Sequence, residues 1–161
     1  MDPQTDKRTS IINGNFFGGR AWLEYHDRHA DERGNLDVFD FDRMPFNPCR
    51  SFLVQGVPAG TVRGGHMHRS GMQMLSCLNG RIEIMMRYHQ EEITLMLCPD
   101  SPALILQSGV WCQQKYVEEN SILLVFASEP YTPTSYINHW NKSEVIRNRS
   151  ANGIVEKSCD D

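Results

Sequence analysis

The sequence lacks an excess of basic residues and lacks any long apolar run. Among its 161 residues, 20 Asp and Glu outnumber 16 Lys and Arg, which gives a net charge of -4. A nucleic-acid binder usually carries a basic patch, so this balance argues against a nucleic-acid partner. No stretch approaches the roughly 20 apolar residues that cross a bilayer. We therefore expect neither a transmembrane segment nor a membrane partner.

Cysteine is present in an odd number and without a recognisable pairing. The five cysteines contain no C-x-x-C spacing, and no charged segment followed by an apolar segment opens the chain as a signal peptide would. These features predict reduced thiols and a cytoplasmic location.

Helical periodicity is missing from most of the chain, and strand-sized runs take its place. Apolar or β-branched runs alternate with Gly, Pro and Asn turn signals at residues 51–55, 72–78, 81–86, 93–97, 103–106 and 122–127. Such spacing predicts one all-β domain, an antiparallel sandwich or barrel, over residues 1–142. We expect a further strand within the first 30 residues and a polar C-terminal tail over residues 143–161.

Two turn signals lie close to the centre of the chain. Asn79-Gly80 predicts a type I′ hairpin between the runs on either side, because that turn needs positive φ at both central residues. Residues 63–65, Arg-Gly-Gly, are interpreted as a second turn.

His66 and His68 occupy alternate positions directly after this second turn. Side chains alternate along a strand with a period of two, so both imidazoles point to one face. That face is suited to a metal, to proton chemistry near neutral pH, or to a hydrogen bond inside a core.

The histidine pair stands inside a longer spacing. Five residues separate Gly60 from His66, four separate His68 from Gln73, and six separate Gln73 from Gly80. This spacing resembles the first signature of the cupin fold, G-x5-H-x-H-x3,4-E-x6-G, with Gln73 in the glutamate position. The resemblance implies a small jelly-roll barrel of antiparallel strands whose mouth holds these side chains.

The positions that bind metal in many cupins are altered. Residues 107–112 resemble the second cupin signature, with Cys112 where a histidine is expected. An amide is a poorer ligand for iron or manganese than a carboxylate, and a thiolate favours softer ions. We predict that no metal and no other cofactor is bound, while zinc held by His66, His68 and Cys112 is the alternative.

A narrower group of cupins matches more of the chain. The matching segments are ERGNL at 32–36, PFNPCRSF at 45–52, VPAGTVRGGHMH at 57–68, QML at 73–75, VWC at 110–112, and LVFAS through YINHW at 124–140. This order resembles the dTDP-sugar 3,4-ketoisomerases with WxcM-like domains. The resemblance implies a homodimeric isomerase of nucleotide-linked 4-keto-6-deoxy sugars that works by proton transfer without metal or redox cofactor.

These motifs provide the candidate site residues. His66 is the first candidate for the catalytic base and His68 for a relay. Arg63 is a candidate clamp on phosphate or sugar oxygens, with an exposed turn arginine as the alternative, and Gln73 a candidate donor to a sugar hydroxyl. Further candidates for substrate binding are Arg50, Phe52, Trp111 and Cys112, although core packing also suits Trp111 and an inert buried thiol also suits Cys112.

Four positions depart from the family pattern. Phe52 stands where a tyrosine is expected, Cys112 for a histidine, Ser135 for an aspartate and Asn138 for an arginine. Three of these changes remove a group that carries charge or exchanges a proton near neutral pH. They define a further alternative, a sugar-nucleotide binder without catalytic activity.

Overall fold

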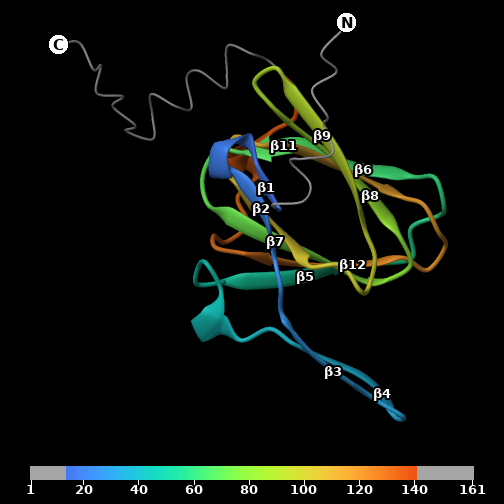
Figure 1. Ribbon diagram of the computed structural model, residues 1–161. Helices are drawn as coiled ribbons and strands as arrows, with labels where there is room; N and C mark the ends of the chain where they lie inside the picture. Colours follow the sequence, from blue (N-terminus) through green and yellow to red (C-terminus); the bar gives the residue numbers. More distant parts are fainter. Residues whose placement is uncertain (1–13, 141–161) are drawn as a thin grey trace, which may run out of the picture.

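The computed structural model describes residues 14–140, and its regular structure is strand apart from three short 3-10 turns (Figure 1). The all-β prediction is confirmed, and the tail over 143–161 lies outside the described residues. The strands are β1 Asn15–Phe16, β2 Ala21–Glu24, β3 Asp27–Asp31, β4 Gly34–Val38, β5 Arg50–Val54, β6 Val62–His68, β7 Met72–Asn79, β8 Ile82–Tyr88, β9 Glu91–Leu97, β10 Ala103–Gln107, β11 Trp111–Tyr116, β12 Ile122–Ala127 and β13 Tyr136–Ile137. No helix within these residues is long and apolar enough to cross a membrane.

Two antiparallel sheets face each other. One has the order β1-β2-β10-β7-β12-β5 and the other β13-β6-β11-β8-β9. From β5 onward the chain passes from one sheet to the other at each connection, except between β8 and β9, which form a hairpin. This alternation makes the fold an open jelly roll, with its two sheets close together in Figure 1.

The core lies between the two sheets. β8 alternates strictly, so that Ile82, Ile84 and Met86 point inward with no exposed surface. Leu75 and Leu104 of the opposite sheet belong to the same buried cluster. Each fully buried aliphatic side chain contributes about 1.5–3 kcal/mol relative to an exposed one, so this interior is the main source of stability for both sheets.

The turn at Asn79-Gly80 joins the two sheets and does not form a hairpin. β7 pairs with β10 and β12, whereas β8 pairs with β9 and β11. The hairpin prediction is therefore wrong, because the two strands bury their apolar faces against each other across the core instead of pairing edge to edge. Glycine is still needed at position 80: its φ is +73°, and a Cβ there would lie 2.3 Å from Ser121 Oγ.

Residues 63–65, interpreted as a turn, belong to strand β6 and contain a β-bulge. Cys112 lies opposite His66 and Gln113 opposite Gly64, so Gly65 is the extra residue. Gly64 and Gly65 both have φ of +74°, a conformation that glycine adopts without strain. The extra residue shifts the alternation of side chains, and Arg63 consequently lies opposite Gln114.

A two-stranded arm leaves the body of the molecule. β3 and β4 pair in a sheet of their own and extend away from the jelly roll (Figure 1). The predicted N-terminal strand is confirmed, since β1 and β2 join the six-stranded sheet, but no pattern predicted the arm. Leu36 on β4 is 60% exposed. The arm therefore presents apolar surface outside the core.

Candidate functional site

His66 and His68 face the interior between the sheets, as their spacing predicted. Their ring centroids lie 5.3 Å apart in an edge-to-face arrangement. Both line a pocket of about 310 Å³, which we call the inner pocket and which Gln73, Cys112 and Gln114 also line. Strands β6, β7 and β11 therefore bring the two signature segments together.

Burial keeps both imidazoles uncharged near neutral pH. Desolvation lowers the pKa of His66, and a backbone hydrogen bond with Gly64 opposes the shift. The pKa of His68 falls to about 4, through desolvation first and then through the nearby His66 and Arg50. A neutral imidazole has a free lone pair, so both rings are able to accept a proton at pH 7.

Gln73 stands on the inner face of β7, the strand at the centre of its sheet. A hydrogen bond between its side chain and His68 partly offsets the lowering of the histidine pKa. Met74, the next residue, points to the opposite face and packs in a separate cluster. The alternation along β7 thus places the amide beside the histidines.

A second hollow adjoins the inner pocket. It measures about 280 Å³, is lined by Arg50, Ser128 and Tyr136, and shares His68 and Gln73 with the inner pocket. We call it the side pocket. His68 and Gln73 therefore stand where the two hollows meet, and His66 lines the inner pocket alone.

Arg50 is fixed in place by aromatic rings. Its guanidinium lies 5.2 Å from the ring centroid of Phe52 and 5.5 Å from that of Tyr131. Its Nη2 donates a hydrogen bond of 3.3 Å to Tyr136 Oη, while its buried Nε has no hydrogen-bond partner among residues 14–140. Of the two sequence candidates, Arg50 thus lines the side pocket, and Phe52 packs against Arg50 without lining that pocket.

Tyr136 is a part of this site that the sequence analysis did not single out. Its ring centroid lies 4.8 Å from that of His66 and 4.6 Å from that of His68. The contact arises because β13 pairs with β6 and sets Tyr136 opposite His68. The segment 124–140 contained this tyrosine, but its pairing with a strand about 70 positions earlier has no local signal.

Arg63 and Cys112 lie on neighbouring strands of the second sheet. The Arg63 charge opposes the effect of burial on Tyr116, whose pKa is nevertheless raised to about 12. Burial also raises the pKa of Cys112 to about 12, and Gln114 Nε2 donates to its Sγ at 3.4 Å. The thiol is therefore neutral at pH 7.

Trp111 lies away from the histidines. It is on the outer face of β11, where it packs with Met67, Ile137 and Trp140. The alternation that turns Cys112 inward turns its neighbour outward. Of the candidate residues, Trp111 alone belongs to this outer cluster, in keeping with core packing.

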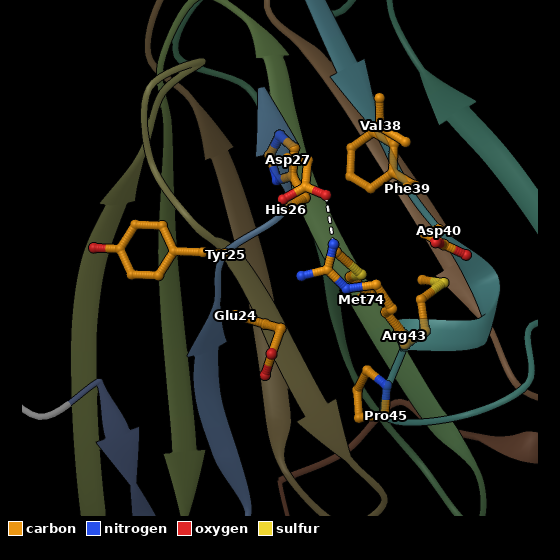
Figure 2. Close-up of a pocket in the computed structure, with 11 residues that line it drawn as sticks. Glu24, Tyr25, His26, Asp27, Val38, Phe39, Asp40, Arg43, Pro45 and Met74 are labelled. Carbon is orange, nitrogen blue, oxygen red and sulfur yellow. Dashed lines mark hydrogen bonds and ion pairs between the residues drawn. The ribbon is translucent and has the colours of Figure 1, made fainter. Parts of the chain in front are cut away.

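A larger hollow of about 430 Å³ lies at the base of the arm (Figure 2). His26 and Arg43 line it, and Arg43 donates to Asp27 at 2.5 Å. Met74 also lines it, so β7 separates this hollow from Gln73 and the inner pocket. Glu24, which also lines it, accepts a hydrogen bond from Trp22. The hollow lacks the two facing imidazoles of the inner pocket.

The donor set around the histidines fits a metal poorly. Residues 14–140 contain no group of three His, Cys, Asp or Glu side chains placed to hold a metal ion. The donors beside the two imidazoles are the amide of Gln73 and the protonated thiol of Cys112. A site without a carboxylate is weak for hard divalent ions.

The sequence of the chain is similar to those of known proteins. A family profile described as "FdtA: WxcM-like, C-terminal" matches residues 21–148. A TDP-4-oxo-6-deoxy-alpha-D-glucose-3,4-oxoisomerase of Aneurinibacillus thermoaerophilus is 31% identical over 116 residues, which cover 69% of this chain and 81% of that protein.

Solved structures are similar over most of their length. QdtA, a sugar 3,4-ketoisomerase of Thermoanaerobacterium thermosaccharolyticum in complex with TDP, matches with a TM-score of 0.75 and 29% identity over 84% of this chain and 98% of that one. A mutant of the same enzyme in complex with TDP-4-keto-6-deoxyglucose matches with a TM-score of 0.74, 28% identity and the same coverage.

Proposed function

The chain belongs to the FdtA, WxcM-like C-terminal family, and from this premise we propose that it isomerises a nucleotide-linked 4-keto-6-deoxy sugar to the 3-keto sugar. The curated relative carries the name of this activity, and a neighbouring structure holds TDP-4-keto-6-deoxyglucose. The observation that carries the proposal is the pair of uncharged imidazoles in the inner pocket, of which His68 also lines the side pocket. We propose that the sugar binds beside His66 and His68.

The reaction moves one proton from carbon to carbon. The base removes the proton at C3, an enediolate forms, and a proton returns to C4, which leaves the ketone at C3. His66 is the proposed base because its pKa is lowered and its ring faces the inner pocket. His68 is the proposed relay and orienting group, since it contacts both His66 and Tyr136.

Arginines are the proposed binders of the nucleotide. Guanidinium groups form charge-assisted hydrogen bonds with phosphate oxygens. Arg63 is exposed on the strand that carries the histidines, and Arg50 lines the side pocket with an unpartnered Nε. Gln73 is the proposed donor to a sugar hydroxyl, Cys112 is a neutral part of the inner pocket wall, and Phe52 is proposed to support substrate binding by holding Arg50.

We propose that the reaction needs no metal, since the donors beside the histidines lack a carboxylate and the Cys112 thiol is protonated. The alternative is a metal-dependent cupin that uses His66, His68 and Cys112. Elemental analysis of the purified protein decides between them, because one tightly held metal per chain would contradict the proposal.

The protein is further proposed to be a cytoplasmic homodimer. Apolar side chains around the arm, such as Tyr25 at 82% exposure and Leu36 at 60%, favour cover by a second copy. The four described cysteines are free, as in a reducing compartment. A monomer by sedimentation at micromolar concentration would contradict the dimer, and export of the full-length protein to the periplasm or medium would contradict the location.

The activity is tested with TDP-4-keto-6-deoxyglucose in deuterated water. We expect the protein to form the 3-keto product and to incorporate deuterium from solvent, both followed by nuclear magnetic resonance. The same rate after treatment with a chelator is expected for the metal-free reaction. If the protein binds the nucleotide sugar but neither isomerises it nor exchanges deuterium, the non-catalytic binder replaces the enzyme.

A further inference from the structure

Tyr136 is the group that contacts both proposed proton carriers. Its ring packs edge-on against His66 and in a tilted arrangement against His68. Its hydroxyl points to the side pocket, where Arg50 donates a hydrogen bond to it. Phe52, which packs against Arg50, has no hydroxyl. Tyr136 therefore brings a phenol to the junction of the two pockets.

Arg50 gives this phenol an unusual setting. The guanidinium lies against the rings of Phe52 and Tyr131, so its position is fixed by packing and not by a carboxylate. No carboxylate is within ion-pair distance of Arg50 among residues 14–140. A fixed and unneutralised cation beside a phenol oxygen stabilises negative charge that develops on that oxygen.

The proposed isomerisation requires proton transfer between two oxygens as well as between two carbons. When C3 loses its proton, the carbonyl oxygen at C4 must gain one, and the hydroxyl oxygen at C3 must lose one. A single imidazole that transfers the proton between C3 and C4 does not also transfer protons at both oxygens in the same step. His68 lies against His66 and supports it as the proposed relay on the carbon side, so a second acid–base group is still needed on the oxygen side of the sugar.

We propose that Tyr136 is this second group, an inference that rests on the proposed function. As His66 takes the proton from C3, the phenol gives its proton to the oxygen at C4, and the enediol forms. The phenolate, next to the Arg50 guanidinium, then accepts the proton of the hydroxyl at C3. The C3 ketone forms as His66 returns its proton to C4, and both residues regain their starting states.

The test compares two phenol deletions on the same enzyme. Tyr136→Phe removes one oxygen and keeps the ring against both histidines. Tyr88→Phe is the matched control, since it removes the hydroxyl of a tyrosine that packs against Phe17 and lines neither the inner nor the side pocket. We expect kcat for TDP-4-keto-6-deoxyglucose to fall about 100-fold in Tyr136→Phe with KM within threefold, and to stay within twofold in Tyr88→Phe.

Further measurements separate this role from a structural one. Thermal unfolding and TDP affinity are expected to match wild type in Tyr136→Phe. Arg50→Gln keeps the phenol but removes its cation, and we expect kcat to fall at least tenfold. If either Tyr136→Phe or Arg50→Gln keeps a wild-type kcat, the inference is wrong while the proposed function stands. No turnover by the wild-type enzyme contradicts the proposed function itself.

Discussion

His66 and His68 share a strand face but differ in their surroundings. Desolvation lowers the pKa of each, yet His68 also lies near the charges of Arg50 and His66, which lower its pKa further. A catalytic base works best when its pKa is close to the working pH. This difference supports the proposal that His66 is the base and His68 the relay.

Replacing His66 by Asn keeps a polar side chain of similar size and removes the proton acceptor. Positioned acid–base catalysis contributes about 10²–10⁴-fold, so kcat is expected to fall by that range while KM changes little. We expect a smaller decrease of kcat in His68→Asn. Steady-state kinetics with TDP-4-keto-6-deoxyglucose measure both, and His139→Asn, at an exposed position, is the control. Wild-type kcat in His66→Asn would place the base elsewhere.

The bulge in β6 sets Arg63 opposite Gln114, which lines the inner pocket together with His66 and His68. Gly64 supports it with a φ of +74°, and a Cβ at this position would lie 2.6 Å from Gln114 Oε1. Gly60 has a similar φ of +83° but no atom within 4 Å of the Cβ position. A comparison of the two glycines therefore separates the cost of backbone strain, which both positions share, from the cost of a close contact, which only position 64 has.

We expect Gly64→Ala to lower the free energy of unfolding by more than Gly60→Ala. The conformational term is common to both and amounts to about 1–2 kcal/mol, while displacement of Gln114 adds to it only at position 64. Urea unfolding of the two variants measures the difference. Equal losses would mean that the Gln114 side chain moves aside without cost.

Several elements were predictable because their signal is local. The apolar runs became strands β5, β7, β8, β9, β10 and β12, and the histidine spacing placed both rings on one inner face. The hairpin at Asn79-Gly80 failed because turn chemistry fixes the backbone angles of a turn but not the partners of the strands beside it. The contacts of Tyr136 depend on long-range pairing of β13 with β6, which no local pattern specifies.

For the whole molecule, the buried histidines make stability depend on pH. The pKa of His68 is lowered to about 4 in the folded state, against about 6.5 for a histidine in an unfolded chain. Between these values the unfolded state binds a proton that the folded state does not. The stabilisation is therefore present above pH 6.5 and is lost as the pH falls toward 4.

The expected loss from this residue is about 1 kcal/mol for each pH unit between pH 6 and pH 4.5. Urea unfolding at pH 7, 6 and 5 measures the slope, and His68→Asn provides the reference without the titrating group. A shallower slope in the variant is expected. The same slope in both proteins would mean that His68 is protonated in the folded state at pH 5.

The proposed site includes residues from a central strand and from a short edge strand. β7, which carries Gln73, is bonded on both sides by β10 and β12, whereas Tyr136 sits on β13, a strand of two residues at a sheet edge. Backbone amides of β7 should exchange with solvent only by global unfolding, and those of β13 by local opening. A ligand bound in the side pocket is therefore expected to slow amide exchange in β13 and to leave the exchange rates of β7 unchanged.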